Sequence, residues 1–276
     1  MRVSSNDIEF IDWLKKVGTG AFGDTVPIPK EWVVHSRDEV VASVFDQGFS
    51  QPASEMLKRL MLATTNRIVD MNNDAILRNI NCDYIDYFSD DRPIDVNPMA
   101  LNAADQDVSQ LNLLNPSGIP AHHLRLKVGS IIVLLINLNT AKSLCNGTRL
   151  IVKKLTDYLI VAEAITGATA QSGIEVAIPK IATTYHDKQP NGVNFERFQF
   201  PVRVAFTMTV TKAQGQTCER LGIDFTEEAF AHGQTYTAFS RATSSDSIRV
   251  YAPNKPVDTD GNVLVRNIVA DGIRFD

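Results

Sequence analysis

Residues 211–217, "TKAQGQT", gather a lysine, two glutamines and two threonines around one glycine, directly after the apolar run "VRVAFTMTV". A cation, amides and hydroxyls on a glycine-containing loop can bind phosphate oxygens. The usual phosphate-binding loop, G-x-x-x-x-G-K-[ST], is absent, because the sequence contains no Gly-Lys dipeptide. The segment therefore indicates a phosphate contact of another kind.

Two further segments carry groups that can do similar chemistry. "ATTN" (residues 63–66) closes a short apolar run with two hydroxyls and an amide, which suits phosphate binding at a helix start. An ordinary helix cap explains the same residues, and the residues alone favour it. "YTAFSRA" places Arg241 beside Ser240 near the end of a helix, where a guanidinium can reach a neighbouring domain. A structural ion pair is the alternative explanation.

Other motifs are rejected on their context. "GTGAFG" (residues 18–23) matches a dinucleotide-binding pattern, but it follows a helical pattern and leads into two prolines instead of a second helix. His122 and His123 have no third metal ligand near them in the sequence. We therefore predict neither a dinucleotide site nor a metal site.

The flanking segments predict an α/β fold. Residues 4–18 show helical apolar spacing, with a polar cap at residues 4–6 and Gly18 as the closing glycine. Residues 36–48 repeat the design, with Ser36 and Glu39 as a capping box. A short strand and a helix capped by Asn66 follow, and helix–strand–helix succession indicates a parallel sheet.

The middle of the chain has a different texture. Residues 89–120 are rich in Asp, Asn and Pro and predict an irregular crossing. Four or five short β-patterned segments separated by turn signals then predict a small barrel. The last third returns to an α/β pattern, with "TKAQGQT" at a strand-to-helix turn. We expect three parts: residues 1–118, an inserted barrel at 119–200, and residues 201–276.

Charge is unevenly distributed along the chain. The net charge is −5 overall, but it is −8 over residues 1–118, +6 over residues 119–220 and −3 over the remainder. A basic middle third suggests a polyanion site, or equally a solvated basic surface. Three isolated cysteines fit a reducing intracellular compartment, such as the nucleus or the mitochondrion, and the compartment itself stays open. No apolar run approaches the ~18 residues that span a bilayer.

Several separated blocks resemble one protein family. "LNPSGIPAHHLRLKVGSIIVLLINLNTAKSLCNGTRLIV" is similar to the barrel region of Pif-family DNA helicases of superfamily one, including those of Helitron-type transposons. "FQFPVRVAFTMTVTKAQGQT" and "HGQTYTAFSRATS" resemble the fifth and sixth helicase motifs of that family, and the opening "MR" resembles the end of another. The resemblance implies the C-terminal part of the motor: a second RecA-like domain interrupted by a Src-homology-three-like barrel.

The resemblance also implies roles for individual residues. Arg241 would be an arginine finger on the ATP γ-phosphate, and Arg2 a second sensor of the same group. The residues that couple the ATP cleft to DNA would be Gln214, Gly215 and Tyr236. The DNA contacts would come from Thr64, Thr65, Asn66, Lys127, Asn146, Arg149, Lys212 and Thr217. Ile136 stands where many relatives carry arginine, so a DNA contact at that position is not expected.

The whole motor would use ATP and Mg²⁺, held mainly by a first RecA-like domain, and would move 5′ to 3′ on single-stranded DNA in repair, recombination or transposition. The P-loop of that first domain is absent from this sequence, so we expect the chain alone not to hydrolyse ATP. The alternative from another class is a non-catalytic module, derived from a helicase, that binds single-stranded nucleic acid.

Overall fold

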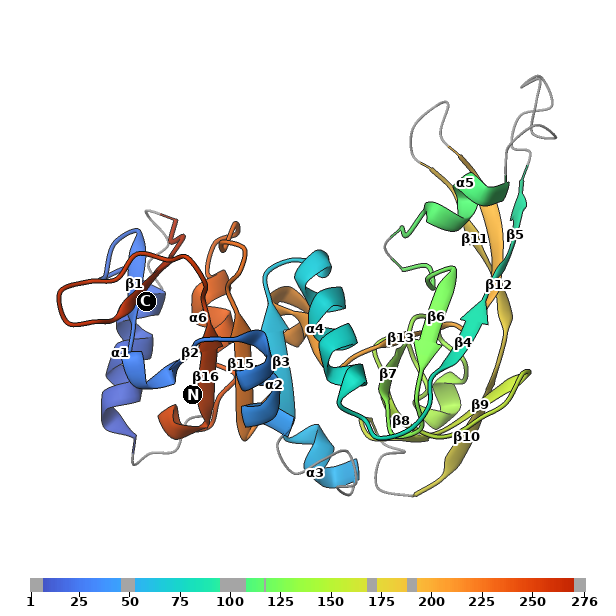
Figure 1. Cartoon of the computed structure of the whole chain (residues 1–276), viewed down its shortest axis with the longest axis horizontal. Coiled ribbons are helices and arrows are strands. Elements are labelled where there is room, and N and C mark those ends of the chain that lie inside the picture. Colours follow the sequence, from blue (N-terminus) through green and yellow to red (C-terminus); the bar gives the residue numbers. More distant parts are fainter. Residues whose placement is uncertain are drawn as a thin grey trace. The chain divides into compact units, whose positions relative to one another are not determined.

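The computed structural model describes residues 7–45, 53–94 (backbone only at 53 and 54), 108–116, 118–167, 173–187 and 193–270. The chain divides into two compact units, which we describe separately. The first unit combines Met1–Asn79 with Phe206–Asp276, and the second unit is Ile80–Ala205. The first unit is thus split in sequence by the second (Figure 1).

A five-stranded parallel sheet forms the centre of the first unit. Its order is β14 (Thr207–Thr209), β3 (Arg59–Ala63), β15 (Arg220–Asp224), β16 (Ile248–Tyr251) and β2 (Val33–Val34). The middle strands β3 and β15 are almost wholly buried, as expected for a parallel sheet covered on both faces. The predicted α/β fold with a parallel sheet is confirmed.

Two helices, α2 (Arg37–Phe45) and α4 (Asn66–Arg78), pack on one face of this sheet and on each other. The predicted apolar face of α2 is confirmed, because Val40, Val41, Val44 and Phe45 are all buried. Gly222 of β15 faces this helix. A Cβ there would lie 2.9 Å from Met61 Cγ and 3.0 Å from a methyl carbon of Val40 and of Val44. A residue without a side chain is therefore needed for α2 to approach the sheet this closely.

The opposite face of the sheet carries α1 (Ile8–Thr19), α6 (Gln234–Phe239) and an antiparallel ribbon of β1 (Thr25–Ile28) and β17 (Val263–Arg266). Aromatic rings fill the space between them: Trp13 meets Trp32 and Phe239 edge-on, at ring-centroid distances of 5.1 and 4.8 Å. The Trp13 indole N–H donates to the Pro27 carbonyl at 3.1 Å, which satisfies its polar group inside the core. The first unit is therefore a three-layer arrangement.

Helix ends differ by one or two residues from the sequence-based expectation. Asp7, not a residue between 4 and 6, caps α1, since its carboxylate accepts from Phe10 N and also from the N and Oγ of Ser245. The helix continues past Gly18 and ends at Gly20, whose φ is +74°. Residues 4–6 and Gly48 lie outside the described residues.

The remaining elements of the first unit are short. They are η1 (Lys30–Trp32), α3 (Ala53–Leu57), η5 (Val210–Ala213) and η6 (Ser245–Ser247). The helix expected after "TKAQGQT" is absent: the segment begins as η5, and β15 follows the loop directly. The predicted strand-to-helix turn is thus wrong in its second half.

The second unit is built from antiparallel pairs. One sheet has the order β10 (Glu175–Pro179), β9 (Leu159–Ala164), β8 (Arg149–Leu155), β7 (Ile131–Leu134) and β13 (Val202–Val204). A second sheet joins β11 (Ile181–Tyr185), β12 (Phe195–Gln199) and β5 (Asp90–Pro93), and a two-stranded ribbon joins β4 (Ile85–Phe88) and β6 (His123–Leu126). Helix α5 (Val108–Leu113) and the turn η3 (Thr140–Lys142) complete it.

One apolar core serves the five-stranded sheet and the ribbon of the second unit. Leu124 and Leu126 from β6 pack with Leu150, Ile160 and Phe200. The recorded strand pairs leave β10 and β13 as edges, so the described residues form an open antiparallel sheet. The Src-homology-three-like barrel therefore stays a prediction.

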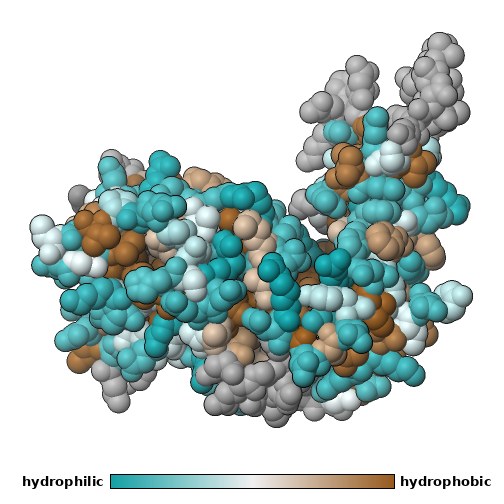
Figure 2. All heavy atoms as spheres, viewed as in Figure 1, coloured by the Kyte–Doolittle hydropathy of each residue, from teal (hydrophilic) through white to brown (hydrophobic). Residues whose placement is uncertain are grey.

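The compact units divide at residues 79/80 and 205/206, so the β4 and β5 strands and α5 belong to the second unit. The functional boundaries at 118/119 and 200/201 stay predictions. Taken as a unit, residues 80–205 hold 11 Lys and Arg against 12 Asp and Glu, so the basic stretch is balanced by the acidic residues before it. Hydrophilic side chains cover most of the face in Figure 2, with apolar ones in small groups. Within the described residues, no helix has the length and apolarity to span a bilayer.

Candidate functional site

Two of the predicted phosphate-contacting segments leave the sheet side by side. β3 and β14 are parallel neighbours, with Ala63 opposite Thr209, so residues 64–66 and η5 begin at the same edge of the sheet. Asn66, Lys212 and Thr217 are exposed there or along the loop that follows. Ligands of open α/β sheets bind at the carboxyl ends of strands. The topology thus brings together groups that are about 145 residues apart in sequence.

The two threonines of "ATTN" hold the local backbone. Thr64 is buried, and its hydroxyl donates to the Glu227 carbonyl at 3.2 Å. Thr65 is the N-cap of α4, because its Oγ1 accepts from Ile68 N at 3.5 Å; Asn66 is the first helical residue instead of the predicted cap. Hydrogen bonds from Thr65 and then Arg67 lower the pKa of Glu227. Asn66 is the member of this segment whose side chain faces solvent.

The tip of the 211–217 loop is a tight turn. Gln216 N donates to the Ala213 carbonyl at 3.0 Å, Gln214 has φ −56° and ψ 130°, and Gly215 has φ +89°. These values describe a type II β-turn, which needs a residue that accepts positive φ at its third position. Nothing lies within 4 Å of a Cβ built on Gly215, so backbone conformation alone selects glycine there. The turn presents Gln214 and Gly215 to solvent.

Arg241 links this loop to α6. Its Nε donates to the Thr237 carbonyl at 3.0 Å, its Nη1 to the Gln216 carbonyl at 3.2 Å and its Nη2 to Ser240 Oγ at 2.8 Å. The backbone joins the same two segments, since Cys218 N donates to the Arg241 carbonyl at 3.0 Å. The predicted finger and the predicted coupling loop therefore touch. A shift of either segment must break or remake these bonds.

Tyr236, the third predicted coupling residue, lies elsewhere on α6. Its ring packs on α1, where a Cβ built on Gly18 would meet Tyr236 Cδ2 at 3.0 Å. Tyr236 is half-buried against the aromatic core of the first unit. Arg2, the other predicted catalytic residue, lies outside the described residues.

In the second unit, the structure buries two of the three predicted DNA contacts. Lys127 is 5% exposed; its Nζ donates to the Ile80 carbonyl at 2.7 Å and lies 4.1 Å from the centre of the Tyr84 ring. Arg149 is 1% exposed and donates from Nη2 to the Ala205 carbonyl at 3.3 Å. Asn146 is exposed on the turn before β8. The basic character of this segment is thus partly internal to the fold.

Sequence reasoning missed a buried ion pair in the second unit. Arg197 and Asp91 both have fully buried side chains and form two bonds, Nε–Oδ1 at 2.8 Å and Nη2–Oδ2 at 2.6 Å. The same guanidinium donates to the carbonyls of Leu111, Leu114 and Pro120. All five N–H groups of the arginine are used, which fixes α5 and the segment after it to β5 and β12.

The acidic partner of this pair is held by further polar groups. Ser89 Oγ donates to Asp91 Oδ1 at 2.6 Å and lies 2.8 Å from His122 Nδ1. Burial acts to raise the pKa of Asp91, but the hydrogen bonds from Arg197 and Ser89 outweigh it and the pKa lies below its ordinary value. Burial lowers the pKa of His122. Partners separated by 106 residues leave no local pattern in the sequence from which the pair could be found.

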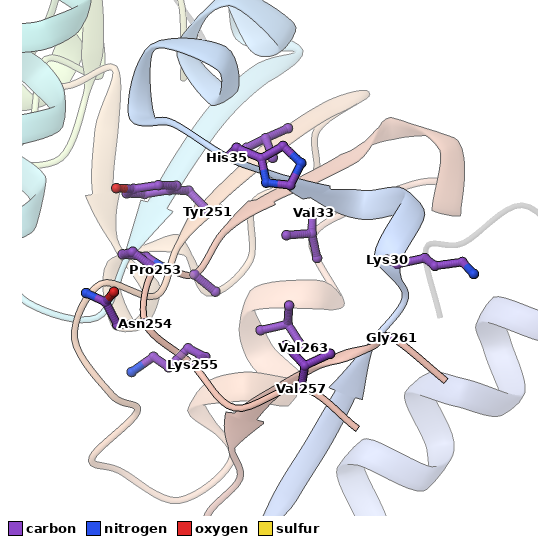
Figure 3. A pocket seen from close by; sticks show the side chains of 12 residues that line it. Lys30, Val33, His35, Tyr251, Pro253, Asn254, Lys255, Val257, Gly261 and Val263 are labelled. Carbon is purple, nitrogen blue, oxygen red and sulfur yellow. The ribbon is translucent and has the colours of Figure 1, made fainter. Parts of the chain in front are cut away.

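A cavity of about 360 Å³ opens at the carboxyl ends of β16 and β2 (Figure 3). Its wall combines apolar groups such as Val33, Val257 and Val263 with the polar groups of His35 and Lys255. The Lys255 ammonium forms an ion pair with Glu228. None of the residues predicted from the sequence to bind ATP or DNA lines this cavity.

Comparison with known proteins gives one consistent result. The family described as "DNA helicase Pif1, 2B domain" matches residues 110–155. The ATP-dependent DNA helicase Pif1 of Campylobacter jejuni is 27% identical over 158 residues, which are 55% of this chain and 33% of that protein. The ATP-dependent DNA helicase PIF1 of Xenopus laevis is 28% identical over 200 residues, 70% of this chain and 30% of that protein. The chain therefore spans about a third of these relatives.

Solved structures agree with the sequence comparison. The Pif1 helicase from Candida albicans is 26% identical, with a TM-score of 0.59, and the match covers 92% of this chain and 55% of that one. The Bacteroides Pif1 structure bound to single-stranded DNA is 19% identical, with a TM-score of 0.57 over 91% of this chain and 50% of that one. The second likeness concerns the fold alone.

Proposed function

Because this chain is a relative of the Pif1-family DNA helicases, we propose that it forms the second RecA-like domain and the inserted barrel of an ATP-dependent DNA helicase that moves 5′ to 3′ on single-stranded DNA. The first unit would close against a P-loop domain, and the second unit would guide the strand. Both assignments follow from resemblance to the family and are supported by the parallel sheet, which is split in sequence by an antiparallel unit.

The observation that carries this proposal is the bond network between Arg241 and the 211–217 loop. The guanidinium donates to a loop carbonyl, at Gln216, and to two acceptors at the end of α6, the Thr237 carbonyl and the C-cap Ser240. If Arg241 turns toward a γ-phosphate when a P-loop domain closes, its side-chain bond to the Gln216 carbonyl is lost, while the backbone bond from Cys218 N to the Arg241 carbonyl still joins the two segments. Nucleotide state would then be transmitted directly to the loop that meets DNA. Such a finger is worth about 10³–10⁵ in rate in other phosphoryl-transfer enzymes.

The proposed DNA path uses the exposed polar groups. Asn66, Lys212 and Thr217 in the first unit and Asn146 in the second are the predicted contacts that reach solvent. A lysine and small polar side chains suit contact with the backbone of a strand of any sequence. Thr64 and Thr65 support this surface from beneath through their hydrogen bonds. For Lys127 and Arg149 we propose a supporting role inside the second unit, because both are buried.

ATP and Mg²⁺ would be held mainly by the P-loop domain. This sequence has no Gly-Lys dipeptide, and its described residues contain no cluster of three His, Cys, Asp or Glu side chains placed to hold a metal ion. The chain's own contribution would be Arg241, together with Arg2, whose position is not described. When bound, the nucleotide and metal supply the phosphoryl-transfer chemistry; the residues of this chain sense and stabilise charge.

The first test is an ATPase assay of the purified 276-residue chain with and without single-stranded DNA. We expect no DNA-stimulated hydrolysis, because the group that positions the phosphates is absent from the sequence. Hydrolysis above background, lost in an Arg241→Ala variant, would contradict this assignment of parts. Arg249→Ala, which removes a half-buried arginine in the same unit, serves as the control.

The second candidate is a non-catalytic module that binds single-stranded nucleic acid. The exposed polar side chains of Asn66, Lys212 and Asn146, which suit contact with a strand of any sequence, support this candidate. The sequence upstream in the transcript distinguishes the two candidates. An in-frame G-x-x-x-x-G-K-[ST] motif there supports the helicase, and translation that starts at Met1 supports the module.

A further inference from the structure

The β4–β6 ribbon of the second unit has one buried and one exposed face. Leu124 and Leu126 point into the core, together with Tyr87 from the neighbouring strand. The alternate residues face outward, as the two-residue period of a strand requires. These outward residues, which we call the ribbon face, are Asp86, Phe88, His123 and Arg125.

Phe88 is the unusual member of the ribbon face. Its side chain is 57% exposed on a strand whose neighbouring apolar residue, Tyr87, is buried. The ring stacks on the imidazole of its cross-strand partner His123, with centroids 4.8 Å apart and planes 9° apart. The backbone beneath is fixed, because Lys180 Nζ donates to the Phe88 carbonyl at 2.9 Å. A flat ring is thus held in a defined orientation and remains open to solvent.

Charged groups border the ring. Asp86 Oδ1 accepts from Arg125 Nε at 2.9 Å and lies 2.6 Å from His123 Nε2. Hydrogen bonds from Arg125 and then His123 lower the pKa of Asp86, and the carboxylate forms an ion pair with Arg125. The Arg125 guanidinium also lies 5.0 Å from the centre of the Tyr84 ring. About half of the Arg125 side chain is exposed.

We propose that the ribbon face stacks an unpaired base of single-stranded DNA on the Phe88 ring, with Arg125 contacting an adjacent phosphate. An oriented aromatic ring beside a cation is the combination that binds single strands without reading their sequence. A protein partner fits less well, because one exposed ring among charged groups falls far short of the ~800 Å² that each side of a stable protein interface buries. This inference rests on the proposed function, since it names a contact for the same DNA strand.

The test is fluorescence anisotropy with a labelled oligothymidylate of about 16 nucleotides, near the site size of small single-strand-binding folds. Phe88→Ala should weaken binding by about 5- to 100-fold, the range expected for the loss of one base stack. Phe88→Trp should keep the affinity. Phe198→Ala, which removes another exposed phenylalanine of the second unit (44% exposed), should leave it unchanged. Thermal melting of each variant verifies folding.

Stacking can be separated from charge with an oligonucleotide of abasic sites. The wild-type chain should prefer oligothymidylate over the abasic strand, and Phe88→Ala should remove that preference. If the wild type binds single-stranded DNA but Phe88→Ala binds equally well, the stacking site is wrong and the proposed function stands. If the wild type fails to bind either strand at low salt, the proposed DNA function itself is overturned.

Discussion

At the scale of single residues, Arg197 is a buried arginine whose five guanidinium N–H groups all donate hydrogen bonds. Its partner Asp91 is equally buried, and the pair is linked to three backbone carbonyls. Burying two charges costs desolvation free energy, which offsets much of the attraction between them. Replacing one partner alone leaves an unpaired buried charge, so it lowers the free energy of unfolding by more than the intact pair contributes. Its role here is to fix α5, Leu114 and Pro120 against the sheet, shortly before the β6 strand that carries part of the ribbon face.

Replacing Arg197 with methionine should reduce the free energy of unfolding by about 3–5 kcal/mol, because the variant leaves a buried carboxylate unpaired. Urea titration measures this. Arg92→Met, which breaks an exposed ion pair with Asp90 on the same strand, should cost less than about 1 kcal/mol. Adding Asp91→Leu to Arg197→Met should recover part of the loss. If Arg197→Met and Arg92→Met reduce the free energy of unfolding equally, the buried pair contributes no more to stability than the exposed one, which would contradict this prediction.

The pH dependence of this pair has a definite sign. In the wild type, the pKa of Asp91 lies below its ordinary value, so its contribution to stability is present above about pH 4 and is lost as the pH falls through the lowered pKa. In Arg197→Met, burial without the cation raises that pKa, so acid relieves the penalty. The stability gap between wild type and variant should therefore narrow from pH 7 to pH 3.

At the scale of elements, the sequence predicted those features that depend on neighbouring residues, such as the buried face of a helix. The buried face of α2 follows from its spacing, and one half of its capping box forms, because Glu39 N donates to Ser36 Oγ at 3.1 Å. The Glu39 carboxylate accepts from His35 N at 2.8 Å, one residue before the cap. Helix α1 begins later than its sequence pattern predicts, because a distant residue, Ser245, donates to the carboxylate of Asp7 and makes Asp7 the cap. The helix also ends later than predicted: it continues through Gly18, which packs against the Tyr236 ring, and its last residue is Thr19.

The candidate site was predictable to a similar degree. Residue types and family resemblance pointed to Arg241 and the 211–217 loop, and the structure brings them together. The burial of Lys127 and Arg149 could not be predicted, because a charge count along a sequence does not distinguish cations that face solvent from cations that satisfy backbone carbonyls inside a fold. The ribbon face depends on the register of two strands separated by more than 30 residues.

The packing of α2 on the sheet gives a prediction at this scale. Gly222→Ala should destabilise the first unit by about 1–3 kcal/mol, since the new methyl group would overlap Met61, Val40 and Val44. Thermal unfolding measures the loss. Adding Val44→Ala should make room, so the double variant should lose less than the sum of the two single variants. Strict additivity would mean that the close approach is not the cause.

At the scale of the whole molecule, each of the two units contributes residues to the proposed contact with single-stranded DNA. The first unit carries Arg241, the proposed nucleotide sensor, and the loop bonded to it, and the second carries Asn146 and the ribbon face. Neither unit has a strong positive charge by composition. The proposed binding would therefore depend on a few cations and one aromatic ring, and we expect a correspondingly modest salt dependence.

The most direct measurement is the salt dependence of oligothymidylate binding by the whole chain and by Lys212→Ala. Lys212 is exposed at the start of the coupling loop, and Lys16→Ala on α1 removes an equivalent exposed charge elsewhere in the same unit. We predict weaker binding for Lys212→Ala and a salt slope smaller by about 0.7 to 1, with no change for Lys16→Ala. Identical curves for all three proteins would contradict the claim that this loop meets the DNA strand.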